Sequence, residues 1–268
     1  MTLSVLTWNT LFAGRDGNDD SRARLQIDVI NSFRPDVFLM QEARGFDAAG
    51  SELLFAMEGS LGMRGFLAIA PVSGQNTAIF IRSSLRAVAF EADGAHFHHA
   101  AAALTVALPG ARSLTFITAH LCPNGAAVRR AEAAYLATRA APDRLVLLAG
   151  DFNSASPHDA EPLGLDELSP NHRARYLGDD GRTADRTVLA ALEAAGWVDV
   201  GHAIGDARVP TVPCVGFVDT EFPTMRCDYV LATRAMAQHA ASYEVIRTAQ
   251  TDVASDHYPV RVTFEGLI

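Results

Sequence analysis

Short apolar runs that end in polar side chains constrain the fold of this chain more than any other feature. Runs such as "VFLMQE" and "RLVLLAGDFN" are continuous rather than alternating, which is typical of strands buried on both faces. A helix-period segment lies before the first of them. It begins at Ser21, a potential N-cap, and stops at Pro35, and its apolar stripe is Leu25, Val29, Ile30 and Phe33.

The remaining elements continue this alternation of strands and helices. Further strands are expected at Leu3–Trp8 and in "TAIFIRS", "AAALTVAL", "SLTFITAHL", "RCDYVLAT", "SYEVIRT" and "YPVRVTFE". Further helices are expected in "GAAVRRAEAAYLATRAA", which Pro142 is expected to end, and in "DRTVLAALEAAGW", which has a glycine stop. No repeat, low-complexity tract or linker interrupts the series. The pattern predicts one domain over residues 1–268, with two packed sheets and helices outside them.

The composition excludes some classes of function. The chain has 268 residues, of which 49% are hydrophobic, and its formal net charge is −9. This is a globular composition with ample material for a core. An acidic protein repels polyanions, so tight binding of duplex DNA is not expected. A phosphorylated substrate of modest size remains compatible, because a bound metal ion or a local basic cluster reverses the sign inside a site.

Cysteine content and hydropathy bear on the cellular location. The three cysteines, Cys122, Cys214 and Cys227, are odd in number and lack paired spacing, which is typical of buried thiols in a reducing compartment. They also lack the Cys-His spacing of a closed structural zinc site. The start, "MTLSVLTWN", does not resemble a signal peptide, and no apolar run is long enough to span a membrane. A cytoplasmic location is therefore expected.

Polar side chains gather at the ends of the predicted strands. Each has an ordinary structural explanation, such as a turn former for an asparagine, a helix cap for an aspartate or a hydrogen-bonded rim position for a histidine. Their joint occurrence favours a catalytic site built on loops that a rigid sheet holds in place. The residues are Asn9, Gln41, Glu42, His120, Asp151, Asn153, Asp228, Asp256 and His257.

The ordered blocks that contain these residues resemble the endonuclease/exonuclease/phosphatase superfamily. The blocks are "TWN", "QE", "TAHL", "GDFN", "RCDYV" and "SDHYPV", and they run from Thr7 to Val260. The superfamily includes pancreatic-type deoxyribonucleases, exonuclease III-like repair nucleases and inositol polyphosphate 5-phosphatases. The resemblance implies a deoxyribonuclease-I-like fold, which is a four-layered α-β-β-α sandwich of two mixed sheets flanked by helices, with the site at one rim.

The chemistry of phosphoester hydrolysis accounts for the oxygen-bearing side chains. A hard divalent cation neutralises charge on the phosphoryl group and acidifies a bound water, and Mg²⁺ needs few protein ligands beyond one or two carboxylates. Glu42 is the first expected ligand, with Asn9 beside it and Asp256 as a further contact. Mg²⁺ is the expected cofactor, and Mn²⁺ is a possible substitute.

The resemblance also implies roles for the other residues. Asp151 would position and activate the attacking water, and Asn153 would hydrogen-bond a phosphoryl oxygen. His120 would contact the phosphate or protonate the leaving oxygen. His257 would lie against the phosphate as a base or a charged stabiliser, while Asp228 would hold its ring and raise its pKa.

Weaker features bear on the substrate pocket. The segment "GQNTAIFIR" resembles the family block that places an amide near the substrate, so Asn76 is expected in the pocket. The segment 171–186 is expected to be a mobile loop that selects the leaving group. Solvated positions are expected for the cluster "HFHH", which is His96–His99, and for Arg82, Arg129 and Arg130.

Three functions stay open at this stage. The repair nucleases tend to carry an acidic residue where this chain has Leu11, and no basic or aromatic run would line a DNA groove. A metal-dependent phosphohydrolase of modest-sized phosphodiesters or phosphomonoesters is therefore favoured over a DNA or RNA endo- or exonuclease. A catalytically silent binding module is disfavoured, because every expected catalytic position is filled.

Overall fold

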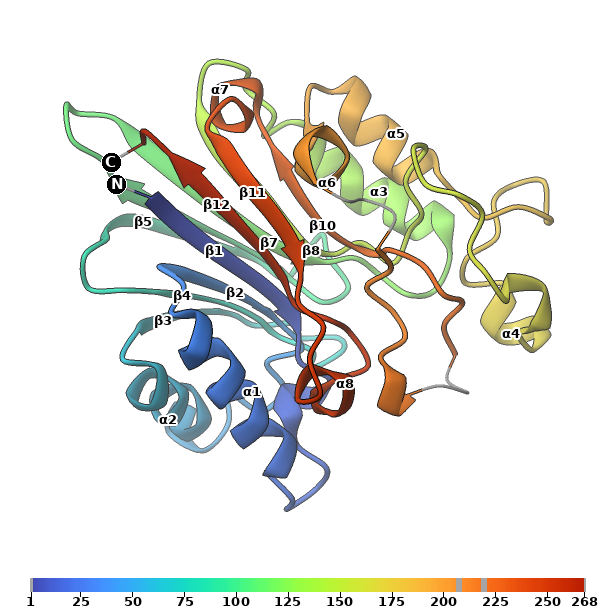
Figure 1. Cartoon of the computed structure of the whole chain (residues 1–268), viewed down its shortest axis with the longest axis horizontal. Helices are drawn as coiled ribbons and strands as arrows, with labels where there is room; N and C mark the ends of the chain where they lie inside the picture. The colour runs from blue at the N-terminus through green and yellow to red at the C-terminus, as the bar shows by residue number, and fades with distance from the viewer. Residues whose placement is uncertain (1, 206–208, 218–220, 268) are drawn as a thin grey trace.

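Two mixed β-sheets pack face to face at the centre of the molecule (Figure 1). The computed structural model describes residues 2–205, 209–217 and 221–267. The first sheet has the order β11 (Ala240–Val245), β12 (Val260–Glu265), β1 (Thr2–Asn9), β2 (Val37–Gln41), β4 (Thr77–Ile81) and β3 (Arg64–Ala68). The second has the order β5 (Arg86–Asp93), β6 (Ala101–Ala107), β7 (Ser113–His120), β8 (Leu145–Asp151), β10 (Asp228–Ala232) and β9 (Val198–Asp199).

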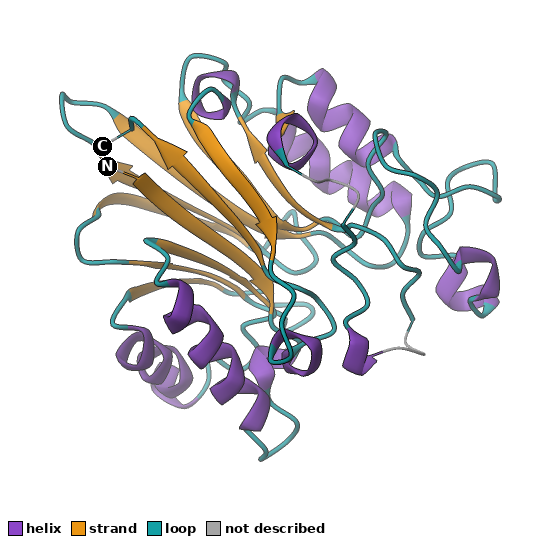
Figure 2. Ribbon diagram, viewed as in Figure 1, coloured by secondary structure: helices purple, strands orange, loops and turns teal. Residues whose placement is uncertain are grey.

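Helices cover the two outer faces, as Figure 2 shows. Helices α1 (Ser21–Phe33) and α2 (Glu52–Leu61) pack on the first sheet, and α3 (Ala126–Ala137) and α5 (Thr187–Ala194) pack on the second. Four short helices complete the chain: α4 (Pro170–Arg173), α6 (Val200–Ile204), α7 (Arg234–Ala237) and α8 (Thr251–Ala254). The expected four-layered α-β-β-α sandwich is confirmed. Within the described residues, no helix is long and apolar enough to cross a membrane.

The continuous apolar runs explain the layering. In β2, Leu39 points into the core between the sheets, whereas Phe38 and Met40 pack against α1 and α2. In β8, Leu147 points into the same central core, and Leu148 packs against α3 and α5. Every residue of β2 is buried, because a central strand in this sandwich has no solvent face.

Strand pairing directs the polar strand ends to one rim. Strands β1 and β2 are parallel and pair Asn9 with Gln41, which places Glu42 just beyond the sheet. Strands β7 and β8 are also parallel and pair His120 with Asp151. Strand β10 runs antiparallel to β8, so its first residue, Asp228, lies opposite the same Asp151. Register alone therefore brings residues from distant parts of the sequence together.

Several local expectations need correction. Ser21 is the first residue of α1 rather than its N-cap, and the preceding Asp20 makes no side-chain capping bond. Helix α3 ends at Ala137, well before Pro142. Helix α2 and the edge strands β3 and β5 had no predicted counterpart. Their apolar pattern is weak because these elements lie at the periphery, and β5 is exposed along nearly its whole length.

Two arginines and one loop also differ from a simple surface assignment. Arg129 is fully buried and donates to the Ser154 hydroxyl and to the Cys122 and Arg175 carbonyls, whereas Arg130 remains partly exposed. Arg82 is partly buried and donates to the Pro35 carbonyl, which follows α1, and to the Leu61 carbonyl at the end of α2. The segment 171–186 contains most of α4 and a bridge between Leu177 and Ala184, so it is an anchored loop with a buried Tyr176.

Candidate active site

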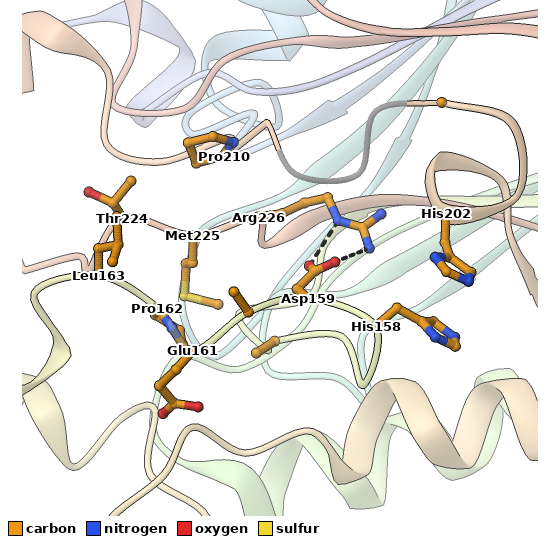
Figure 3. A pocket seen from close by; sticks show the side chains of 13 residues that line it. His158, Asp159, Glu161, Pro162, Leu163, His202, Pro210, Thr224, Met225 and Arg226 are labelled. Carbon is orange, nitrogen blue, oxygen red and sulfur yellow. Dashed lines mark hydrogen bonds and ion pairs between the residues drawn. The ribbon is translucent and has the colours of Figure 1, made fainter.

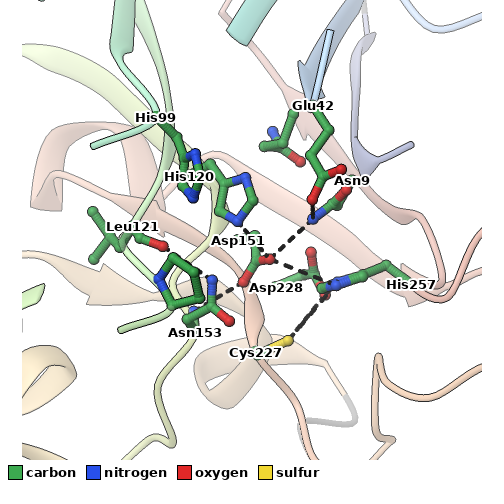
Figure 4. Close-up of polar contacts among 12 residues, drawn as sticks. Asn9, Glu42, His99, His120, Leu121, Asp151, Asn153, Cys227, Asp228 and His257 are labelled. Atoms are coloured by element: carbon green, nitrogen blue, oxygen red, sulfur yellow. Dashed lines mark hydrogen bonds and ion pairs between the residues drawn. The ribbon is translucent and has the colours of Figure 1, made fainter. Parts of the chain in front are cut away.

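Asp151 is the centre of a polar cluster at the rim of the sandwich (Figure 4). Its Oδ2 lies 3.1 Å from Asn9 Nδ2, 3.3 Å from His120 Nε2 and 3.6 Å from His257 Nε2. The four side chains come from both sheets and from the loop before β12, and all four are buried. The strand before Asp151 approaches β7 so closely that a Cβ on Gly150 would lie 2.0 Å from the Ala119 carbonyl oxygen. Only glycine fits there, which accounts for the "AGDFN" sequence.

His257 and Asp228 form a buried pair beside Asp151. The carboxylate Oδ2 of Asp228 lies 2.9 Å from His257 Nδ1. Burial alone would lower the pKa of His257, but the carboxylates of Asp228 and Asp151 outweigh it and raise the pKa well above its ordinary value. The imidazole is therefore a cation at neutral pH, and it forms a charge-assisted hydrogen bond with Asp228.

Contacts with the first sheet fix the loop that carries His257. The indole Nε1 of Trp8 donates to the His257 carbonyl oxygen at 2.7 Å. The Ser255 hydroxyl donates to the Asn9 carbonyl oxygen at 2.7 Å and accepts from the His257 amide at 3.3 Å. The "SDH" sequence thus supplies a serine that anchors the loop and a histidine that the loop presents to Asp151.

Glu42, Asn9 and Asp256 form an oxygen-rich group next to this cluster. Glu42 Oε1 accepts from Asn9 Nδ2 at 3.4 Å, and Oε2 accepts from the Phe12 amide at 2.9 Å. Glu42 has a φ of 60°, an unfavourable conformation for a residue with a side chain, which is often retained at functional sites. Burial and then the nearby Asp256 carboxylate raise the pKa of Glu42 to about 7.

This group fits a hard divalent cation. Two carboxylates that repel each other, the partly buried Glu42 and the buried Asp256, are the oxygen donors that Mg²⁺ and Mn²⁺ prefer. Asn9 turns its Nδ2 toward Glu42 while its Oδ1 accepts from the Leu11 amide at 3.1 Å, so its side-chain amide would have to turn over to offer the oxygen to a cation. Burial raises the pKa of Asp256, and the negative charge of Asp151 adds to this effect. A cation among these side chains would relieve the repulsion that raises both pKa values.

We expect the thermal stabilisation by Mg²⁺ to increase with pH. Because folding raises the pKa of Glu42 from 4.5 to about 7, the metal-free protein loses stability as the pH rises through about 7. Below this pH, Mg²⁺ must displace the proton of the Glu42 carboxyl in order to bind. Above it, Glu42 is already deprotonated and no proton has to be displaced. The rise in Tm on adding Mg²⁺ should thus be larger at about pH 8 than at about pH 6. Scanning fluorimetry measures both values, and Glu42→Gln should remove the difference; an equal rise at both pH values would contradict the assignment.

Asn153 lies against Asp151 from the other side. Its amide N donates to Asp151 Oδ1 at 2.9 Å, and its side-chain Nδ2 donates to the Leu121 carbonyl oxygen at 3.0 Å. Its φ of 48° is one that asparagine tolerates better than most residues. Asn153 therefore orients Asp151 and keeps one side-chain N–H for another acceptor.

Asn76 lies behind Glu42 rather than among the cluster residues. Its side chain accepts from the Ala70 amide at 2.8 Å and donates to Asp47 Oδ1 at 2.7 Å and to the Ala43 carbonyl oxygen at 3.3 Å. It is fully buried, and no hydrogen bond within the described residues joins it to the cluster around Asp151. These contacts make Asn76 a support for the backbone that follows Glu42.

His99 is a site residue that the sequence did not indicate. Its ring stacks on His120 with centroids 4.2 Å apart and accepts or donates a hydrogen bond with the Ser73 hydroxyl at 2.9 Å. Burial lowers the pKa of His99 to about 2 and that of His120 to about 3, so both rings are neutral. Exposure was expected for the whole "HFHH" segment, and it holds for His96 but not for His99. The small apolar residues of β6, which follow His99 in the sequence, were the feature that could have predicted the burial of His99.

Arg175 and Phe222 border the cluster on the side of the 171–186 loop. The Arg175 guanidinium lies 5.9 Å from the Phe222 ring, and Phe222 meets the His257 ring edge to face at 5.2 Å. Glu221 pairs with Arg175 at 2.6 Å. The aromatic ring beside His257 is suited to a flat leaving group, and the Arg175 guanidinium next to that ring could reach a phosphate only in competition with Glu221.

A separate cavity of about 600 Å³ lies beside the segment that leads into β10 (Figure 3). None of its described lining residues belongs to the cluster around Asp151. Its buried Arg226 is paired with Asp159 at 2.9 Å and Asp199 at 2.7 Å, so among the described lining residues this arginine is not free to bind a phosphate. His158 and His202 stack at its margin with centroids 3.7 Å apart. The geometry of acids and histidines therefore favours the Asp151 cluster as the active site.

Comparisons with known proteins agree with this fold. A model of the Endonuclease/Exonuclease/phosphatase family matches residues 6–257. TDP2 from D. rerio complexed with single strand DNA product is 18% identical, with a TM-score of 0.70 and 99% of each chain covered. An AP endonuclease from Archaeoglobus fulgidus is 19% identical (TM-score 0.69; 98% of this chain and 100% of that chain covered). A mannosyl-6-phosphatase from Bacteroides thetaiotaomicron is 16% identical (TM-score 0.66; 97% and 98% covered). The search of curated proteins finds no match.

Proposed function

The chain belongs to the endonuclease/exonuclease/phosphatase family, and from this premise we propose that it is a divalent-metal-dependent phosphohydrolase. It would cleave a phosphodiester or phosphomonoester of modest size by attack of water. The observation that carries the proposal is the convergence of Asn9, His120 and His257 on the carboxylate of Asp151, at 3.1 to 3.6 Å. These residue types at one buried point supply a water-binding carboxylate and two imidazoles for the phosphate.

The oxygen-rich group would hold the cation. When bound there by Glu42, Asn9 and Asp256, Mg²⁺ or Mn²⁺ supplies charge neutralisation at the phosphate and a more acidic water. Asp151 would accept a hydrogen bond from the attacking water and orient it toward phosphorus. Asn153 fixes the other carboxylate oxygen of Asp151, so the acceptor atom keeps its direction.

The two histidines have different electrostatic states. His257 is cationic because Asp228 and Asp151 outweigh its burial, so it stabilises the charge that develops on the phosphoryl oxygens rather than acting as a base. His120 is neutral, since burial lowers its pKa to about 3, and it contacts the phosphate as a neutral hydrogen-bond donor. Asp228 holds the ring of His257 through Nδ1 and leaves Nε2 facing Asp151.

A nuclease is the second candidate, and one observation favours it. Phe222 lies next to His257 and Arg175 lies next to Phe222, and aromatic rings and guanidinium groups stack on nucleobases. TDP2 with a single strand DNA product and the AP endonuclease are similar in fold, as is the mannosyl-6-phosphatase. The net charge of −9 and the absence of a basic run favour a short or small substrate over a long polymer.

A panel of phosphoesters tests the proposal directly. The protein would be assayed with Mg²⁺ or Mn²⁺ against an aryl phosphodiester, an aryl phosphomonoester, sugar phosphates and short single-stranded oligonucleotides, with His257→Ala as the matched control. Metal-dependent turnover that chelation abolishes and His257→Ala lowers is the expected result. Turnover of oligonucleotides alone would promote the nuclease, whereas no turnover in the whole panel would favour a silent binding module.

We expect binding of duplex DNA to be weak and to fall steeply with salt. An acidic protein repels the duplex at long range, and the contacts that remain are those of a few local arginines with phosphates. Fluorescence anisotropy of a labelled duplex at low and physiological salt measures both properties, with a single-stranded oligonucleotide for comparison. Tight binding that persists at physiological salt would overturn the preference for a substrate of modest size.

A further inference from the structure

Cys227 is a buried thiol in the active site that the proposed hydrolysis does not use. It immediately precedes β10, and its Sγ lies 3.8 Å from His257 Nδ1 and 3.6 Å from Asp228 Oδ2 (Figure 4). Its side chain is buried, with only 1% of the residue exposed. A hydrophobic residue would fill this position equally well, so a sulfur at this distance from a catalytic imidazole calls for a chemical explanation.

Three different donor atoms meet at this point. One ligand atom from each of Asp151, Cys227 and His257 lies within 4.8 Å of the other two. Two ligands bound to Zn²⁺ at about 2.3 Å for sulfur and about 2.0 Å for nitrogen, at a tetrahedral angle, are separated by roughly 3.5 Å. The distance of 3.8 Å between Cys227 Sγ and His257 Nδ1 is close to this separation. Asp151 Oδ2 lies 3.6 Å from the other ring nitrogen, Nε2, so for a single ion on Nδ1 the Asp151 carboxylate must move closer and the 2.9 Å hydrogen bond between Nδ1 and Asp228 must open.

The donor types separate this triad from the oxygen-rich group. Mg²⁺ prefers hard oxygen ligands, which Glu42, Asn9 and Asp256 provide. An oxygen, a sulfur and a nitrogen together suit a borderline cation such as Zn²⁺, which binds thiolate and imidazole strongly. The rim of the sandwich thus presents two adjacent sets of ligands with opposite preferences.

We propose that Asp151, Cys227 and His257 form an inhibitory binding site for Zn²⁺ or a cation of similar softness. The bound ion would occupy the carboxylate that orients the water and the imidazole that stabilises the phosphate, so hydrolysis would stop even when Mg²⁺ is present. The thiol proton and the proton on the ligating nitrogen of His257 both leave to solvent as the thiolate and the neutral imidazole bind the metal. The binding stands on the geometry of the triad, whereas the inhibition rests on the proposed function.

Binding is tested without any substrate. Metal-free Glu42→Gln protein, which lacks the main ligand of the oxygen-rich group, would be titrated with Zn²⁺ by calorimetry and with Co²⁺ by absorption spectroscopy. We expect one equivalent of each metal to bind, with a thiolate-to-cobalt charge-transfer band. Adding Cys227→Ala should remove that band and weaken Zn²⁺ binding by at least about 100-fold, because even an outer-shell partner of a metal ligand typically contributes 10- to 100-fold.

Matched variants keep the test decisive. Cys122→Ala removes another buried thiol, outside the triad, and should change neither titration. Cys227→Ser keeps the size of the side chain and replaces Cys227→Ala if that variant does not fold. An unchanged Zn²⁺ affinity in a folded Cys227 variant, or a cobalt spectrum without a thiolate band, would show that the site does not exist.

Inhibition is tested separately on the Mg²⁺-saturated enzyme. The ratio of turnover with and without Zn²⁺ would be measured for the wild type, Cys227→Ser and Cys122→Ala. We expect strong inhibition of the wild type and of Cys122→Ala, and a requirement for at least about 100-fold more Zn²⁺ in Cys227→Ser. Equal inhibition of all three would contradict the proposal. If no substrate is turned over, the proposed function fails while the binding titrations still decide whether the site exists.

Discussion

Replacement of His257 by alanine is expected to lower kcat by about 100- to 10,000-fold in a protein that remains folded. The imidazolium is held 2.9 Å from Asp228 and 3.6 Å from Asp151, so it is a fixed positive charge where the phosphoryl oxygens would become more negative. His120 cannot replace this charge because it is neutral, and Arg175 at the border of the cluster is paired with Glu221 at 2.6 Å. Steady-state kinetics on the substrate found in the phosphoester panel, together with a thermal melt, measure the effect.

The partner of His257 should act through it rather than independently. Asp228→Asn is expected to keep the fold and to lower kcat by a similar order, because the amide no longer stabilises the imidazolium. The double variant should then lose little more than His257→Ala alone, since the two side chains form one unit. Additive losses in this cycle, or nearly normal turnover in a folded His257→Ala protein, would show that the pair serves only the structure.

The sequence predicted the layers and the rim because both depend on local patterns. Continuous apolar runs indicated strands buried on both faces, and β2 and β8 are such strands. Parallel neighbours end at the same edge, so polar residues at the ends of apolar runs converge once the pairing is right. The pairing of His120 with Asp151 in β7 and β8 is an example of such convergence. The topology of the sheets was implied by the resemblance to a family.

Positions that depend on packing between distant segments could not be predicted in this way. The sequence predicts Arg129 to be a surface residue of an amphipathic helix. Its guanidinium instead donates hydrogen bonds to the Ser154 hydroxyl and to the carbonyls of Cys122 and Arg175. His99 lies in a run of histidines and yet only this one meets His120. In both cases the deciding contact joins segments more than 20 residues apart, and periodicity does not report such contacts.

The loop between β8 and α5 shows a further limit of composition. The segment 171–186 is rich in arginine, aspartate and glycine, which favours a solvated loop. Arg175 instead donates to the Pro123 carbonyl and pairs with Glu221, and Tyr176 is buried beneath the loop. Charged residues fix this loop through specific acceptors, so the loop presents Arg175 next to Phe222, the ring that contacts His257.

Asp151→Asn is also expected to lower kcat by about 100- to 10,000-fold. The dependence of the variant's turnover on Mg²⁺ concentration should distinguish the role of Asp151 from that of Glu42. Asp151 Oδ2 accepts from Asn9 while Oδ1 accepts from the Asn153 amide. A neutral amide keeps only one of these acceptors, and it binds the attacking water less strongly. The fold should survive with a stability loss of about 1–3 kcal/mol, the usual cost of an unsatisfied buried donor.

The contrast between two variants is the decisive measurement. If Asp151 handles the water and Glu42 holds the cation, Asp151→Asn should lower kcat at every Mg²⁺ concentration without shifting the concentration that gives half of its maximum rate. Glu42→Gln should shift that concentration upward, because it removes a carboxylate ligand whose charge the cation neutralises. Turnover as a function of Mg²⁺, with calorimetric binding of Mg²⁺ in the absence of substrate, measures both effects. A shift of equal size in the two variants would mean that Asp151 is itself a ligand of the cation, and the attacking water would then need another acceptor in the cluster.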